Sequence, residues 1–74
     1  MDCYNFSFII GEPKDEEKFV DKLYESGCDE ALYCVVFGVP QIEFDCYSDS
    51  LEEAIINCLN KVRKIGGSVH YIIT

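Results

Sequence analysis

Basic residues are scarce in this 74-residue chain and are absent from its middle. Six Lys or Arg stand against fourteen Asp or Glu, which gives a formal net charge of −8. No base occurs from residue 23 to residue 60, and the only cluster of bases is Lys61, Arg63 and Lys64. Nucleic-acid binding needs several bases that replace counterions along the phosphate backbone. The sequence therefore predicts no direct binding of nucleic acid.

Long apolar runs are missing as well. An uninterrupted run such as residues 32–37 is far too short to cross a bilayer. The first residues, MDCYN, contain no basic segment of a secretory signal. We therefore expect a cytoplasmic protein that does not enter a membrane. The length suits a single domain, residues 1–74, and an apolar content of 49% is enough for a compact core.

Residues that usually carry catalysis or bind metal are few. The five cysteines include no CxxC pair, and His70 is the only histidine. We expect no cofactor and no metal, with the cysteines reduced and acting as small hydrophobes, and with Cys34 and Cys46 as possible neighbours across a hairpin. His70 could meet Glu43 or Asp45 as an acid–base pair or half of a metal site. We favour a surface pair and no enzyme, because no nucleophile or oxyanion donor set accompanies it.

The clearest positive signal is a helix in residues 50–67. Ser50 followed by Glu53 is a capping-box pattern, and Gly66-Gly67 provides a left-handed stop. Acids occupy its first turn and bases its last turn, as the helix dipole favours. Seven apolar residues recur at steps of three and four and form its buried stripe: Leu51, Ala54, Ile55, Cys58, Leu59, Val62 and Ile65.

In the rest of the chain, segments with alternating apolar and polar residues, or rich in β-branched and aromatic residues, predict four strands. An apolar stripe at helical spacing predicts one more helix. Two strands form a hairpin around a turn at Gly38-Val39-Pro40. The order βαββαβ predicts an α+β fold, a ferredoxin-like sandwich with a four-stranded antiparallel sheet and two helices on one face. The expected strands are residues 4–10, 31–37, 41–47 and 68–73, and the first helix runs from Asp15 to about Ser26.

The second face of such a sheet is left open, and a partner or a second copy could cover it. We place on this face Asn5, Ser7, Ile9, Glu43, Asp45, His70 and Ile72, with Tyr33, Val35 and Phe37 from the second strand. A homodimer through this face would use Ile9, Val35, His70 and Ile72.

The acid-rich interval allows two interpretations. It could be a solvated face that keeps the protein soluble, or a surface that presents phosphate-like charges to a basic partner protein. In the second case the topology gathers acids at one end of the domain. The expected partner-binding residues are Asp29, Glu30, Glu43, Asp45, Asp49, Glu52 and Glu53.

Four segments carry a resemblance to a known family. In chain order they are Gly27-Cys28-Asp29-Glu30-Ala31-Leu32, a hairpin that ends in Ile42-Glu43-Phe44-Asp45, Ser50-Leu51-Glu52-Glu53-Ala54-Ile55, and Val62-Arg63. Together they resemble the N-terminal α/β module of small bacterial helix-turn-helix regulators of the antitoxin type. In those regulators a DNA-binding helix-turn-helix follows the module, and this sequence has none after it. The resemblance thus implies the part that contacts protein, and it supplies no catalytic residues.

Size and charge alone are also similar to inhibitors encoded by phages and mobile elements, including anti-CRISPR proteins and DNA mimics. We therefore expect a small non-enzymatic protein that covers a basic nucleic-acid-binding surface on a partner protein in a bacterial host cell. The alternative is a dimerising or partner-binding module related to antitoxin-type regulators, which acts through its open sheet face.

Overall fold

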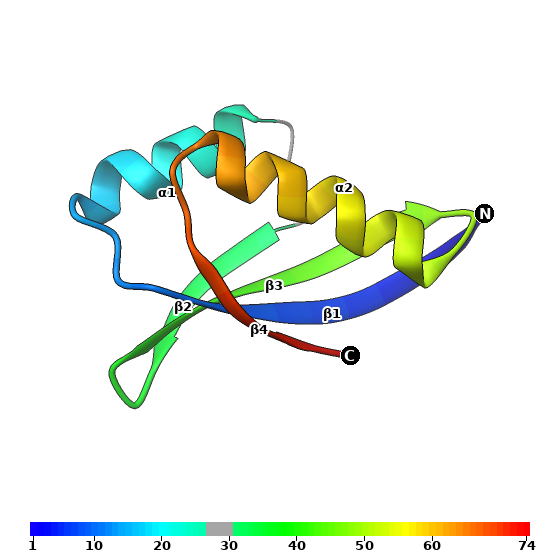
Figure 1. Cartoon of the computed structure of the whole chain (residues 1–74), viewed down its shortest axis with the longest axis horizontal. Helices are drawn as coiled ribbons and strands as arrows, with labels where there is room; N and C mark the ends of the chain where they lie inside the picture. Colours follow the sequence, from blue (N-terminus) through cyan, green and yellow to red (C-terminus); the bar gives the residue numbers. More distant parts are fainter. Residues whose placement is uncertain (27–30) are drawn as a thin grey trace.

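The computed structural model describes residues 1–26 and 31–74, which form six elements (Figure 1). The strands and helices follow one another in the order βαββαβ. The elements are β1 (Asp2–Ile10), α1 (Glu16–Glu25), β2 (Ala31–Val36), β3 (Val39–Ser48), α2 (Leu51–Lys64) and β4 (Val69–Ile73).

The four strands make one sheet in the order β2-β3-β1-β4, and every neighbouring pair is antiparallel. It follows that β1 runs parallel to β2, and β3 runs parallel to β4. Helix α1 therefore joins the parallel strands β1 and β2, and β3 lies between them. Helix α2 joins the parallel strands β3 and β4, and β1 lies between them. Both helices lie on the same face of the sheet (Figure 1). The α+β class, the element order and the antiparallel four-stranded sheet predicted from the sequence are confirmed.

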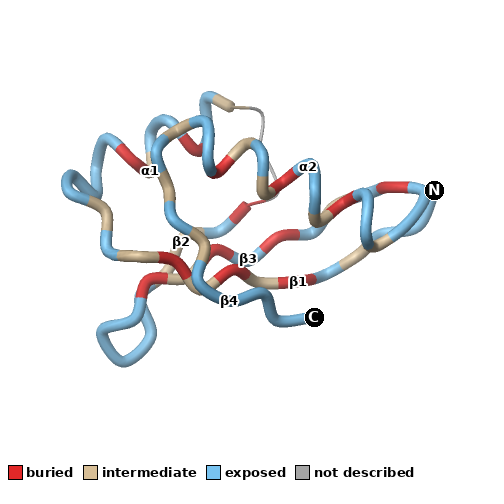
Figure 2. Tube along the Cα trace, viewed as in Figure 1, coloured by how far each residue is buried: buried red, intermediate tan, exposed pale blue. Residues whose placement is uncertain are grey.

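The core lies between the helices and the sheet, where the buried segments of both layers face each other (Figure 2). Its centre is an aromatic cluster of Phe6, Phe8 and Phe44, whose ring centroids are 5.0 to 5.6 Å apart. These rings come from β1 and β3, the two central strands of the sheet. The helices contribute Phe19 and Leu23 from α1 and three residues of the predicted α2 stripe, Ala54, Cys58 and Val62.

The helix ends follow the sequence signals closely. Asp15 caps α1 by accepting a hydrogen bond from the amide of Lys18 at 3.2 Å. Ser50 caps α2 in the same way, with the amide of Glu53 at 3.1 Å. At the other end of α2, Gly66 has φ of +90°, and the Gly67 amide donates to the carbonyl of Val62 at 2.9 Å. The predicted cap and stop of α2 are confirmed. No helix in the described residues is long and apolar enough to cross a bilayer.

The β2–β3 hairpin turn starts one residue earlier and ends two residues earlier than the sequence predicted. Its loop is Phe37-Gly38, with φ of 51° and 79°, and Val36 pairs with Val39 across it. Two successive positive φ angles define the tight hairpin turn for which Asn-Gly is the usual sequence. The prediction was wrong because Pro40 was assigned to the turn. Pro40 instead lies in β3 opposite Val35, one residue beyond the last pair between β3 and β1. The missing N–H of Pro40 therefore interrupts no bond to β1.

Phe37 is a strained residue with no packing to compensate it, because its side chain is fully exposed. Replacing Phe37 with asparagine is expected to raise the stability by about 1 kcal/mol, since asparagine tolerates the left-handed region. This corresponds to a rise of roughly 4–8 °C in melting temperature for a domain of this size. Differential scanning calorimetry measures the shift. Val36→Asn, one position earlier at φ below zero, is the control and should not stabilise the protein; equal melting of wild type and Phe37→Asn would show that the turn carries no strain.

The hairpin register reverses the predicted faces of β2. Residues paired across an antiparallel ladder share a face. Tyr33 pairs with buried Ile42, and Val35 with Pro40, so both lie on the helix side of the sheet. The prediction that placed Tyr33 and Val35 on the open face was therefore wrong, and Phe37 lies in the turn. The residues of β2 on the open face are Leu32, Cys34 and Val36.

A β-bulge produces the second correction, in β4. Ile9 pairs with Tyr71 and the next residue, Ile10, pairs with Val69, so His70 is the extra residue. Beyond the bulge Ile72 pairs with Phe8 and lies on the helix side, whereas Tyr71 and Ile73 lie on the open face. The sequence had predicted the reverse for all three, because a strict two-residue period leaves no room for an inserted residue. Val69 packs against the core, as predicted.

Candidate functional site

β1 begins, β3 ends and α2 begins at the same end of the molecule (Figure 1), and acidic residues occupy these segments. Asp2 pairs with Ser48, the last residue of β3, and Asp49 follows directly. Glu52 and Glu53 then occupy the first turn of α2. Asp45 lies three residues before Ser48 on the open face of the sheet. We call this group, all of whose members are exposed, the acidic end: Asp2, Asp45, Asp49, Glu52 and Glu53.

Most of the acids that no nearby base offsets lie at this end. Segments 12–25 and 61–64 together hold six acids and all six bases, so their charges cancel. The remaining eight acids carry the whole net charge of −8, and five of them form the acidic end. The N-terminus of α2 offsets part of their mutual repulsion, because its unpaired amides attract negative charge. Asp2 was not predicted, and only its pairing with Ser48 brings it to this end.

The open face connects the acidic end to the hairpin tip. Asp45 accepts a hydrogen bond from Nδ2 of Asn5 at 2.6 Å, which fixes its carboxylate against β1. Glu43, two residues further from the acidic end on β3, lies between Ser7 on β1 and Leu32 on β2. Of the predicted partner-binding residues, Asp49, Glu52 and Glu53 therefore follow one another at this end, whereas Asp45 and Glu43 lie on the open face, on the other side of the sheet from α2. Asp29 and Glu30 lie outside the described residues.

The four residues predicted as a dimer face do not share one face. Ile9 lies on the open face, half-buried between Gln41 and Tyr71. Val35 and Ile72 lie on the helix side, as the registers above establish. His70 is exposed in the bulge beside the backbone of Gly11, where a Cβ would lie 3.3 Å from its Nε2 atom. The apolar residues that the open face does expose are Leu32, Val36, Val39, Tyr47, Tyr71 and Ile73.

The proposed approach of His70 to Glu43 or Asp45 is not formed. Glu43 pairs with Ser7, whereas His70 lies beyond Ile9, and β1 separates the two strands. Glu43 and His70 are two strand spacings apart across the sheet and between two and three residues apart along the strands. Their backbones therefore lie on the order of 13 Å apart. Asp45 is further still. In the described residues no group of three or more His, Cys, Asp or Glu could hold a metal ion.

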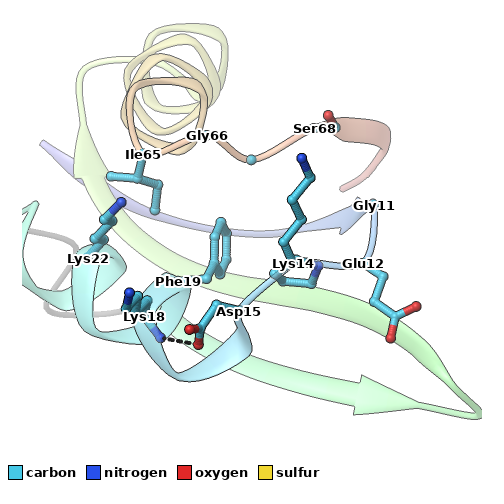
Figure 3. Close-up of a pocket in the computed structure, with 12 residues that line it drawn as sticks. Gly11, Glu12, Lys14, Asp15, Lys18, Phe19, Lys22, Ile65, Gly66 and Ser68 are labelled. Atoms are coloured by element: carbon cyan, nitrogen blue, oxygen red, sulfur yellow. Dashed lines mark hydrogen bonds between the residues drawn. The ribbon is translucent and has the colours of Figure 1, made fainter.

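Five of the six bases line a groove that the sequence did not predict. Lys14, Lys18 and Lys22 surround a hollow of about 480 Å³ that also contacts Phe19 and Ile65 (Figure 3). An adjoining hollow of about 440 Å³ shares Lys22 and adds Lys61 and Lys64. The lysines are distant in sequence and meet because the last turn of α1 lies beside the last turn of α2. A spacing of four residues from Lys14 through Lys18 to Lys22 was the available signal.

This groove is suited to weak contact with anions and not to strong binding. None of its lysines forms an ion pair with a described carboxylate. However, Glu12, Asp15 and Glu25 also line the two hollows, so that the excess of positive charge is small. The carboxylate of Asp15 already accepts the Lys18 amide, and Glu12 points away from Phe19 (Figure 3). Phe19 is 6% exposed and offers little surface for stacking.

Tyr33 joins the sheet to α1 at the side of the molecule away from the acidic end. Its hydroxyl donates to a carboxylate oxygen of Glu16 at 3.3 Å, and its ring packs on Phe19 with centroids 6.0 Å apart. Burial raises the pKa of Tyr33, and the negative charge of Glu16 raises it further. Tyr33 therefore remains protonated at neutral pH and serves as a hydrogen-bond donor between the layers.

The cysteines are arranged differently from the prediction. Cys34 pairs with Gln41 on the open face, so it does not face Cys46 across the hairpin. Cys46 points to the helix layer, where its sulfur lies 3.2 Å from that of Cys58 on α2. Sequence periodicity placed both residues on buried faces, but it could not show that they meet.

Comparison with protein-family models, with curated proteins and with solved structures finds no match to this chain.

Proposed function

We propose that this protein works without catalysis, in the bacterial cytoplasm, by presenting its acidic end to a basic surface of a protein partner. The partner surface would otherwise hold nucleic acid, so the protein acts as an inhibitor of the anti-CRISPR or DNA-mimic kind. One observation carries the proposal: acids in segments that contain no base account for the whole net charge, and five of the six that the structure describes lie at the acidic end. Complementary charge of this kind gives fast and selective docking.

The fold supports this use of the acidic end. We propose that the arrangement is a ferredoxin-like sandwich. Each helix joins two parallel strands, and one strand of the other βαβ segment lies between them. In such a sandwich the connection between β3 and α2 is fixed at one end by the strand pairing of β3 and at the other end by the cap of α2. The acids of this connection are thus presented by a rigid frame, with Asp45 fixed by Asn5 and α2 capped by Ser50. A rigid frame lowers the entropy that a charged surface loses on docking.

Neutralising the acidic end should abolish most of the partner affinity. The test variant is Asp49→Asn with Glu52→Gln and Glu53→Gln, and the matched control is Glu17→Gln with Asp21→Asn and Glu25→Gln on α1. Both remove three negative charges from exposed positions. The partner is isolated from bacterial lysate on immobilised wild type, and titration calorimetry then measures affinity at low and high salt. We expect at least a tenfold loss, about 1.4 kcal/mol, for the first variant and less than twofold for the second.

The salt series separates this function from a simple solubilising role. Docking by charge predicts that wild-type affinity falls as salt rises, and that the slope flattens in the acidic-end variant. Equal losses in both variants would mean that only total charge matters, and the proposal would then be wrong.

A second candidate function, related to antitoxin-type regulators, is dimerisation or partner binding through the open sheet face. The observation that favours it is the exposure of apolar side chains there, with Leu32, Tyr71 and Ile73 each more than half exposed.

The bulge in β4 provides a sharp test of this candidate. Ile73→Asp changes the open face, whereas Ile72→Asp changes the helix side of the same edge strand. Light scattering should show a dimer that dissociates in the first variant and persists in the second. A wild-type monomer at high concentration would exclude a homodimer.

A further inference from the structure

The sulfur atoms of Cys46 and Cys58 are 3.2 Å apart, although one residue belongs to β3 and the other to α2. This distance exceeds the length of a disulfide bond by only roughly 1 Å. We propose that Cys46 and Cys58 are a reversible disulfide site whose oxidant is a small disulfide such as oxidised glutathione.

The surroundings select this pair from the cysteines that the structure describes. Cys46 lies on the helix side of β3, two residues after buried Phe44. Cys58 lies on the buried stripe of α2 and is 4% exposed. Both sulfurs therefore lie between the two layers of the fold. Cys3 and Cys34 pair with Tyr47 and Gln41 on the open face, so the sheet separates them from this pair.

The difference in burial assigns a role to each thiol. Cys46 is only half-buried, so its thiolate attacks one sulfur of oxidised glutathione. The S–S bond of glutathione breaks, one glutathione thiolate leaves, and a mixed disulfide forms on Cys46. Cys58 then loses its proton and attacks Sγ of Cys46. A second glutathione leaves, so that two protein thiols are oxidised and one glutathione disulfide is reduced to two thiols.

The new bond would enclose part of the acidic end. Asp49, Glu52 and Glu53 lie between the two cysteines in sequence, so the disulfide closes a ring around them. Oxidation would thereby hold the acid-bearing segment to the sheet. This consequence rests on the proposed function, whereas the disulfide itself does not.

The test uses a variant that keeps only this pair, with Cys3→Ala, Cys28→Ala and Cys34→Ala. Incubation with oxidised glutathione should lower its mass by two hydrogens and remove both thiols from alkylation. A ring of this size should also raise the melting temperature by about 10 °C or more. Dithiothreitol should reverse each change. Wild-type chain treated in the same way should form the same intramolecular bond, identified by peptide mapping.

Two single replacements test the assigned roles. In Cys58→Ala made in the variant that lacks Cys3, Cys28 and Cys34, glutathione should remain attached to Cys46, because no second thiol of the chain is present to displace it. In Cys46→Ala, Cys58 should stay unmodified over the same period. The proposal is overturned if the pair keeps both thiols, if the bond forms between two chains, or if Cys58 is modified as fast as Cys46. None of these readouts involves a partner, so they stand or fall independently of the proposed docking.

Discussion

Phe44→Ala is expected to remove a large part of the stability of this domain. Phe44 is 1% exposed in the central strand β3, and its ring packs on those of Phe6 and Phe8 at 5.4 and 5.0 Å. Truncating such a ring costs about 3–5 kcal/mol, because the transfer energy is lost and a cavity remains. A domain of this length has a total stability of only about 4–11 kcal/mol. The substitution therefore removes a large part of the margin.

Urea denaturation followed by circular dichroism measures this loss. The matched control is Tyr47→Ala, on the same strand but on the open face and 70% exposed, for which we expect a loss below about 1 kcal/mol. A cooperative transition of Phe44→Ala with a midpoint close to that of wild type would show that the aromatic cluster is not the centre of the core.

Gly67→Ala is the second substitution with a large expected effect, and its cause is steric. A Cβ at this position would lie 2.5 Å from Cγ1 of Val62 and 3.1 Å from both the Val62 carbonyl oxygen and Cε1 of Phe19. The first contact is shorter than real Cβ atoms allow, so α2 and α1 must shift. We expect a loss of about 1–3 kcal/mol in the free energy of unfolding.

A double-mutant cycle identifies the clash. Val62→Ala removes the atom that Gly67→Ala would meet, so the double variant should be more stable than the sum of the two single losses predicts. Strict additivity would contradict the steric explanation. Gly66→Ala provides a contrast at the neighbouring position. Its Cβ would meet nothing within 4 Å, and the cost there comes from φ of +90°, which asparagine should partly relieve.

Local signals were sufficient for the order of the elements and for the ends of the helices. The capping residues Asp15 and Ser50 and the stop at Gly66 act within one helical turn, so their meaning does not depend on the rest of the fold. The alternation of Phe6, Phe8 and Ile10 identified the buried face of β1 for the same reason. The order of these elements then left few possible sheet topologies.

The predicted sheet faces were wrong where the strand pairing departs from a regular two-residue period. The two-residue turn at Phe37-Gly38 exchanged the sides of Tyr33 and Val35 relative to the prediction, and the bulge at His70 did so for Tyr71, Ile72 and Ile73. A shift of one residue moves every following side chain to the other face of a strand. The alternation of a single strand cannot reveal such a shift, because it depends on the partner strand.

The sequence by itself determined the class of fold, the helix boundaries and the excess of acids, because each depends on composition or on neighbours a few residues apart. Only the tertiary structure decided which charges and thiols meet. It joined Asp2 to the acidic end, gathered five lysines in a groove far from it, and brought Cys46 to Cys58. The physical reason is that strand register and helix packing set these distances, and both arise from contacts between residues that are remote along the chain.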